Sequence, residues 1–313
     1  MLGNTGKGLS IRYGASLVGV GAAALKLSCI IQETKQATLT PKDRQALRDN
    51  TIKYSSDNSS DSKDPPFSAF FFSSLVGSRL RFLAIDYMKD STLKKPLPYG
   101  LASLNRHGLF YLFEAGGCKL GEVYLSRYFG TFSNMSDSMN KGLSSFFAIG
   151  GISSCFVAFD VVLTRPSLLN NVTNFSLLVS SIKNIFRVSY HPSVISASLG
   201  RNYLFTGFTL CSGSMLSSLP DIYRDSKGVK ILAAIISGAF STIPHYIFVN
   251  NVHRISEQKV PLRFTFNVSL KAMFCRGAYS GVILVGSMSF VNLLTFFNNE
   301  SMKNKPRNIT NEK

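Results

Sequence analysis

The feature that most limits what this chain can fold into is a series of long apolar segments separated by polar, mostly basic stretches. The clearest segment covers residues 141–165 and stops directly before Pro166. Only 16% of the 313 residues are charged, whereas a soluble domain carries about 25%. The sequence therefore predicts a membrane protein, and the segments are long enough for helices that cross a bilayer but too long for barrel strands.

Six apolar segments predict six transmembrane helices. They cover residues 8–32, 100–128, 141–165, 194–219, 228–252 and 267–296. Each is interrupted by Gly, Ser, Arg or Asn, which is typical of helices that pack against one another and line a polar cavity. We therefore expect an all-α membrane protein. Residues 173–188 predict a short amphipathic surface helix, and residues 67–90 favour a helix in the membrane interface over a true span.

The polar stretches predict where the chain leaves the membrane. Residues 33–66 are rich in Ser, Asp, Lys and Pro, which indicates an insertion outside the bilayer. The net charge is +17, and most Lys and Arg residues lie between the apolar segments. Because the chain has no recognised nucleic-acid-binding motif, this charge predicts contact with anionic lipid headgroups and no nucleic-acid partner.

An internal repeat organises the segments. Ala102-Ser103-Leu104-Asn105-Arg106 recurs as Ala197-Ser198-Leu199-Gly200-Arg201 and, more loosely, as Ala272-Met273-Phe274-Cys275-Arg276. The stretch at Ala158-Phe159-Asp160 likewise corresponds to Pro244-His245-Tyr246. We predict three pseudo-symmetric repeats, each with two spans: residues 1–130 with the polar insertion 33–66, residues 131–225, and residues 226–313 with a polar tail.

This repeat pattern resembles the mitochondrial carrier family, whose odd-numbered spans carry a signature of the type Pro-x-Asp/Glu-x-x-Lys/Arg-x-Arg/Lys. Asp160 and Arg165 match the acidic and the last basic position, while Ala158 and Leu163 depart from it. Pro244 keeps the proline of the third repeat. The resemblance implies a six-helix bundle in the mitochondrial inner membrane.

The resemblance also implies positions for solute contact. Carriers often have an arginine in each even-numbered span at the level of the substrate, and Arg106, Arg201 and Arg276 look like those positions. They are candidates for binding an anionic solute or a lipid phosphate, because Arg can bind such groups in bidentate geometry. Alternatively, they are inherited positions that now pair with Glu114.

The charges that close carriers are mostly missing. In the family, the acid of one signature pairs with the base of the next, and a second charged set closes the other end. Asp160 remains, but its expected basic partners are replaced by neutral residues. Of the second set only Lys119 and Glu122 are charged, in reversed order. We interpret Asp160, Arg165, Pro244, Lys119 and Glu122 as remnants of a signature and gate.

For Asp160 and Arg165 three roles stay open. They form a local ion pair with each other, they are a surviving element of the gate, or they contact a neighbouring subunit. An ionisable residue in an apolar span is costly and marks a functional site by default.

Two functions follow from these observations. The chain is a degenerate carrier-like protein that serves as a structural or accessory subunit of a respiratory-chain or other inner-membrane complex, with Phe-rich residues 67–72 and 290–297 as contacts. Alternatively, it carries a small anionic metabolite, such as a nucleotide, phosphate or carboxylate, by alternating access. The scattered Cys and His residues predict no enzyme, no metal and no cofactor beyond a bound phospholipid such as cardiolipin.

Overall fold

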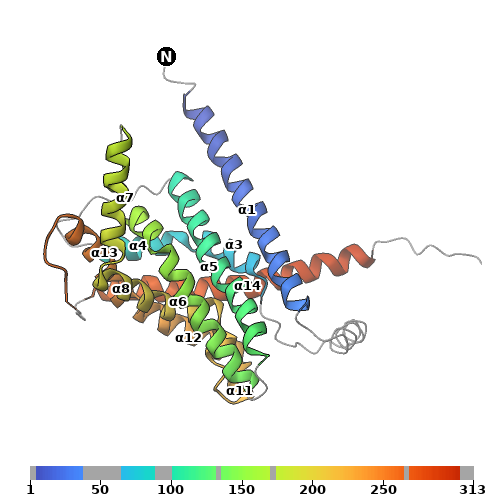
Figure 1. Cartoon of the computed structure of the whole chain (residues 1–313). Coiled ribbons are helices and arrows are strands. Elements are labelled where there is room, and N and C mark those ends of the chain that lie inside the picture. Colours follow the sequence, from blue (N-terminus) through green and yellow to red (C-terminus); the bar gives the residue numbers. More distant parts are fainter. Residues whose placement is uncertain are drawn as a thin grey trace, which may run out of the picture.

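A computed structural model describes residues 5–37, 65–88, 101–131, 135–169, 174–263 and 268–303. Within these ranges the fold is helical and contains no β-strand, so the predicted all-α class is confirmed (Figure 1). The long helices are α1 (Thr5–Ala37), α5 (Leu101–Phe129), α6 (Asp137–Thr164) and α14 (Leu270–Lys303). The shorter ones are α3 (Phe67–Val76), α4 (Ser78–Met88), η2 (Pro166–Leu168), α7 (Phe175–Ser189), α8 (Pro192–Asn202), η3 (Tyr203–Gly207), α9 (Phe208–Leu210), α10 (Ser212–Met215), α11 (Asp221–Arg224), α12 (Lys227–Phe240) and α13 (Thr242–Ser256).

The number of helices that could cross a membrane is smaller than the six predicted. In the described part of the chain, three are long and apolar enough: α6, the α12–α13 pair, and α14 over Leu270–Asn292. A fourth is reached if the bent pair α3–α4 counts as one broken span. The prediction of six was too high by this measure because α5 carries Glu114, Lys119 and Glu122 along its length, and because residues 194–219 form several short helices.

The helices follow one another around the bundle in chain order. Contacts run from α1 to α5, from α5 to α6, from α6 to α8, from α8 to α13 and from α12 to α14. The helices α3 and α4 pack on α14, and α3 also packs on α1, so this pair closes the ring. Figure 1 shows α5 and α6 side by side as a long hairpin.

The helix α6 begins and ends where its sequence dictates. The Oγ atom of Ser136 caps the first turn by accepting a hydrogen bond of 3.3 Å from the backbone N–H of Met139, and Asp137 favours the positive end of the helix. The helix stops at Thr164 because Pro166 restricts the residue before it to extended conformations.

The segment at 67–88 differs from its prediction. It is not a surface helix but two helices bent by 59° at Gly77, and most of α3 is buried in the bundle. The reason is that Phe67, Phe70 and Phe71, at positions i, i+3 and i+4, form one apolar face of α3 that packs into the core of the bundle. The proposed role of residues 67–72 as a partner contact is therefore wrong for these side chains, whereas most of 290–297 lies outside the described side chains.

A break divides the segment that contains Pro244. The helices α12 and α13 meet at Ser241, and Pro244 lies in the first turn of α13. Proline is tolerated there because the first N–H groups of a helix have no partner within the helix. Pro244 therefore marks the start of a new helix, and the two helices together still pass as one candidate span.

Close packing of α12 on α14 depends on glycines. A Cβ atom added at Gly277 would lie 2.9 Å from the backbone oxygen of Ile235, and one at Gly238 would lie 2.6 Å from the Cβ of Ser280. Small residues let two helix backbones approach in this way. In α1, a Cβ atom at Gly21 would contact Phe72, whereas Gly19 faces open space, so only Gly21 lies at a packing contact.

The helix α7 is amphipathic, as predicted for residues 173–188, but its orientation was not foreseen. Ile185 and Val188 are buried, whereas Phe175, Ile182 and Phe186 are exposed. Figure 1 shows α7 extending away from the rest of the bundle. Its exposed apolar side chains are therefore available for contact with lipid or with another protein.

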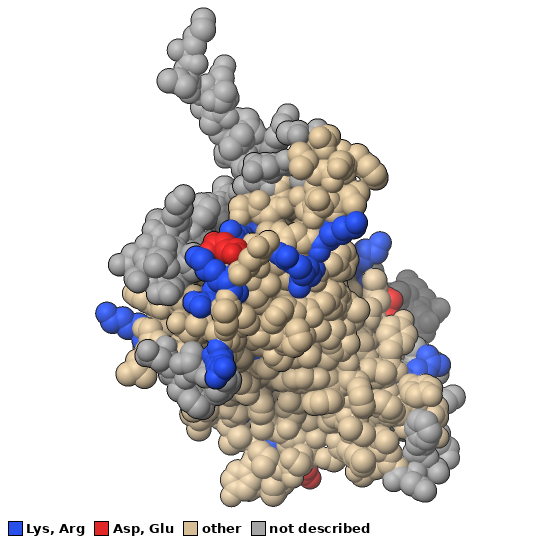
Figure 2. All heavy atoms as spheres, turned by 60° about the vertical axis from the view of Figure 1, so that its left-hand side comes forward, with Lys and Arg blue, Asp and Glu red and all other residues tan. Residues whose placement is uncertain are grey.

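The surface itself is divided by charge. Figure 2 shows that Lys and Arg gather over the upper part of one face, while a broad region below them carries almost no charge. A wide uncharged surface bordered by basic groups is typical of a protein whose sides contact hydrocarbon and whose ends contact headgroups.

Candidate functional site

The centre of the bundle contains a buried ion pair between two helices. Arg201 of α8 donates a hydrogen bond from Nη1 to a carboxylate oxygen of Asp160 in α6. The side chains are 3% and 7% exposed, so both charges are held away from water. The Arg201 guanidinium also lies 5.1 Å from the ring centroid of Phe248 in α13, which covers its face.

A second carboxylate completes this cluster. Glu114 of α5 lies 3.8 Å from the other terminal nitrogen of Arg201. The amide of Asn202 donates hydrogen bonds to Glu114, at 2.7 Å, and to the hydroxyl of Ser153, at 2.8 Å. Three helices, α5, α6 and α8, are therefore connected through one buried polar network, in which every charge has a partner.

Arg276 occupies a neighbouring position on α14. Its guanidinium lies 4.5 Å from the ring centroid of Phe205, and its Nε donates a hydrogen bond of 3.2 Å to Ser241. Its Nη1 is buried and has no hydrogen-bond partner among the described residues. Arg81 and Arg201 are both close enough to repel its charge, and Asp160 is close enough to attract it.

The structure thus brings together only part of the predicted set of arginines. Arg201 and Arg276 both point into the core, and Arg201 pairs with Glu114 and Asp160. Arg106 lies on α5, but its side chain is outside the described residues. The sequence did not single out Asn202 and Arg81, although Asn202 directly follows Arg201 and its polarity in an apolar stretch was a usable signal.

Asp160 and Arg165 do not pair with each other. Arg165 lies 3.1 Å from Glu257 and donates to the backbone oxygen of His253, at 2.9 Å, and to the hydroxyl of Ser256. These contacts join the end of α6 to the end of α13. This interhelical link is partly exposed.

Glu257, which directly follows α13, contacts two cations. Its carboxylate accepts a hydrogen bond of 2.8 Å from Lys259 and lies 3.1 Å from Arg165. The Lys259 hydrogen bond, with a further contribution from Arg165, lowers the pKa of Glu257 below its ordinary value.

Lys119 and Glu122 form a pair within α5, toward the opposite end of the bundle. Their charged atoms are 2.8 Å apart, and both side chains are buried. Glu122 also accepts hydrogen bonds from Ser145 of α6, at 2.8 Å, and from Ser214 of α10. Lys119 and Glu122 therefore pair within one helix, and Glu122 is also held by hydroxyl groups of α6 and α10.

No described group of His, Cys, Asp or Glu side chains could hold a metal ion. The chain matches no protein-family model, no curated protein and no solved structure in the comparisons made.

Proposed function

We propose that this protein is a fixed structural or accessory subunit of a membrane assembly, with the plan of a mitochondrial carrier but without its gates. The observation that carries the proposal is the buried network around Arg201. It connects Glu114 of α5 to Asp160 of α6 within one arrangement. An alternating-access protein needs charged contacts that form in one state and break in the other.

The distribution of the remaining charges supports this proposal. Asp160 is bound to an even-numbered span, whereas a carrier gate would bind it to the next odd-numbered span. Separating Asp160 from Arg201 would leave the buried Asp160 carboxylate without its cation, which costs about 3–5 kcal/mol. The bundle is therefore built to stay in one conformation. In this proposal the protein lies in the mitochondrial inner membrane, and α1, α5 and the α8–α10 segment lie within the bilayer together with the three apolar spans.

The exposed apolar side of α7 supports an assembly role. Phe175 is 79% exposed and Phe186 is 50% exposed, on a helix that extends from the bundle. In the assembled complex these rings would be covered by lipid or by another subunit.

Two measurements test the proposal. The tagged protein is extracted from membranes in digitonin and separated by native electrophoresis, and the pure protein is reconstituted into liposomes loaded with phosphate, ADP or malate. We expect co-migration with a large complex and no exchange. Saturable exchange by the pure protein, or migration only as a monomer, would overturn the proposal.

A second candidate, a carrier of a small anionic metabolite, is supported by one observation. Arg276 keeps a buried nitrogen without a hydrogen-bond partner, close to Arg81 and Arg201. Such a group could bind a carboxylate or phosphate that enters the core. The liposome experiment separates this candidate from the first, and Arg276→Gln would abolish any exchange that depends on it.

A further inference from the structure

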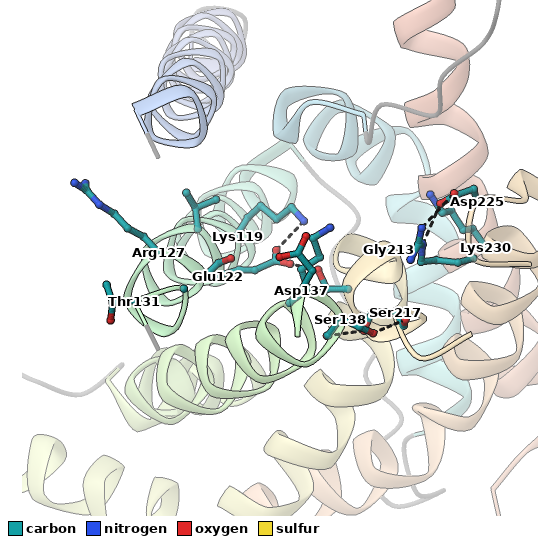
Figure 3. A pocket seen from close by; sticks show the side chains of 16 residues that line it. Lys119, Glu122, Arg127, Thr131, Asp137, Ser138, Gly213, Ser217, Asp225 and Lys230 are labelled. Atoms are coloured by element: carbon teal, nitrogen blue, oxygen red, sulfur yellow. Dashed lines mark hydrogen bonds and ion pairs between the residues drawn. The ribbon is translucent and has the colours of Figure 1, made fainter. Parts of the chain in front are cut away.

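A cavity opens at the end of the bundle where α5 ends and α6 begins. Its volume is about 670 Å³, which lies in the range of sites that hold small ligands. The walls come from the last turns of α5, the first turns of α6, the segment around α10 and α11, and the start of α12 (Figure 3). The cavity is separate from the Arg201 network, because neither Arg201 nor Arg276 lines it.

The charges on the cavity wall are unbalanced. The basic residues that line it are Lys119, Arg127, Lys141, Arg224 and Lys230, and the acidic ones are Glu122, Asp137 and Asp225. Two of the acids already have cationic partners, since Glu122 pairs with Lys119 at 2.8 Å and Asp225 with Arg224 at 3.3 Å. With or without these pairs, the lining has two more basic than acidic residues, which leaves a net positive cavity.

Two of the lysines are buried, which strengthens the electrostatic effect of their charges. Lys119 and Lys230 are each only 6% exposed, so their charges act in a medium less polar than water. Figure 3 shows Lys119 pointing from α5 toward the middle of the group of residues drawn, whereas Arg127 extends away from them. Lys141 of α6 is exposed at the wall and has no ion-pair partner among the described residues.

Hydroxyl groups add neutral donors to the same wall. Ser138 and Ser217 are joined by two reciprocal hydrogen bonds to each other's backbone oxygens, of 2.5 and 3.1 Å, which fix α6 against the segment after α10. Ser126, Thr131 and Ser214 also line the cavity. The α6 N-terminus favours an anion here and the α5 C-terminus opposes one, so the preference comes from the side chains.

We propose that this cavity binds an anion that carries phosphate groups. Lysine ammonium groups with nearby hydroxyls match phosphate oxygens as charge-assisted and neutral donors. A soluble phosphate ester and the headgroup of an anionic phospholipid share this chemistry, and the cavity lies at an end of the bundle that either could reach. The proposal is independent of the accessory role, because a fixed subunit and a carrier could each hold such an anion.

Pyrophosphate titration tests the proposal. The full-length protein is placed in nanodiscs of phosphatidylcholine, and binding of inorganic pyrophosphate is measured by calorimetry. We expect saturable binding that Lys141→Glu weakens by about ten-fold or more, since a hydrogen bond to a charged group contributes about 1.5–3 kcal/mol. Lys183→Glu makes the same charge change on the surface of α7 and should leave the affinity nearly unchanged.

Two outcomes would overturn the proposal: no saturable binding of pyrophosphate by the parent protein, or equal affinity in Lys141→Glu and the parent. A thermal melt of both proteins shows that the variant is folded, which is expected because a glutamate near the start of α6 suits the helix dipole. Repeating the titration in nanodiscs that contain phosphatidylglycerol identifies the source. Weaker pyrophosphate binding there indicates a lipid headgroup, and unchanged binding indicates a soluble phosphate ester.

Discussion

Arg201 and Asp160 form an ion pair across two helices whose residues lie 41 positions apart in the chain. Both side chains are almost fully buried, and Glu114 lies on the other side of the guanidinium at 3.8 Å. The pair, together with Glu114, connects α6 and α8 to α5 through buried charges.

Removing Arg201 should be more damaging than removing the charge of Asp160. Arg201→Met leaves two buried carboxylates without a cation and should lower the free energy of unfolding by about 3–5 kcal/mol. Asp160→Asn leaves Arg201 paired with Glu114 and should cost less. Unfolding in detergent micelles, followed by circular dichroism, measures both. Asp221→Asn, on an 81% exposed side chain, is the control and should change little. Equal losses for the two core variants would contradict this assignment.

Gly277 should not tolerate a methyl group. Its Cβ would meet the backbone oxygen of Ile235 at 2.9 Å, and a backbone atom cannot move aside cheaply. We expect Gly277→Ala to lower the free energy of unfolding by about 1–3 kcal/mol. Gly151→Ala is the matched control, since nothing lies within 4 Å of the position where its Cβ would be. That variant should be neutral or up to about 1 kcal/mol more stable. A loss of similar size in both variants would show that α12 and α14 are not this close.

Glu257 should make a small contribution to stability that depends on pH. Its pKa is lowered in the folded protein by Lys259 and Arg165. A carboxylate whose pKa is lower in the folded than in the unfolded protein stabilises the fold at pH values above its unfolded pKa of about 4.3. This stabilisation is lost as the pH falls through the folded pKa. The melting temperature of Glu257→Gln should therefore be below that of the parent at neutral pH, and the difference should close in acid. The side chain is 38% exposed, so solvent screening keeps the effect small. A difference that widens toward low pH would refute the assignment.

Cys155 gives a test of membrane insertion. It is exposed on α6, in a span whose outward side also presents Phe147 and Phe159. If that side contacts hydrocarbon, the thiol cannot form the thiolate that reacts with maleimide. We expect no labelling of Cys155 by a charged maleimide in nanodiscs and full labelling after denaturation in dodecyl sulfate, as measured by mass spectrometry. A cysteine introduced at Ile222, which is 78% exposed outside the candidate spans, should react in both conditions. Rapid labelling of Cys155 in nanodiscs would place α6 in water.

The sequence predicted single helices well and their partners poorly. The segments 100–128 and 141–165 correspond to α5 (Leu101–Phe129) and α6 (Asp137–Thr164), because apolar runs and helix caps are local signals. The break in 194–219 was missed, because a π-helical turn at Tyr203–Gly207 has no strong local signature.

The candidate site was also predicted only in part, because its individual residues are visible in the sequence but their pairing is not. Asp160, Arg201 and Arg276 stood out because a charge in an apolar run is visible in the sequence. Their pairing could not be read there, since the contact of Asp160 with Arg201 depends on how α6 crosses α8. The burial of Phe67, Phe70 and Phe71 also depends on neighbours that are distant in the chain.

The π-helical turn at Tyr203–Gly207 has a consequence for the far end of the same segment. Such a turn holds one residue more than a regular turn, so deleting one codon here would restore an α-helix. Every side chain beyond it would then rotate by about 100° around the helix axis. Ser214 would no longer face Glu122, and Ser217 would no longer face Ser138. The length of the chain at this turn, as much as the identity of the serines, determines which groups meet at the mouth of the cavity.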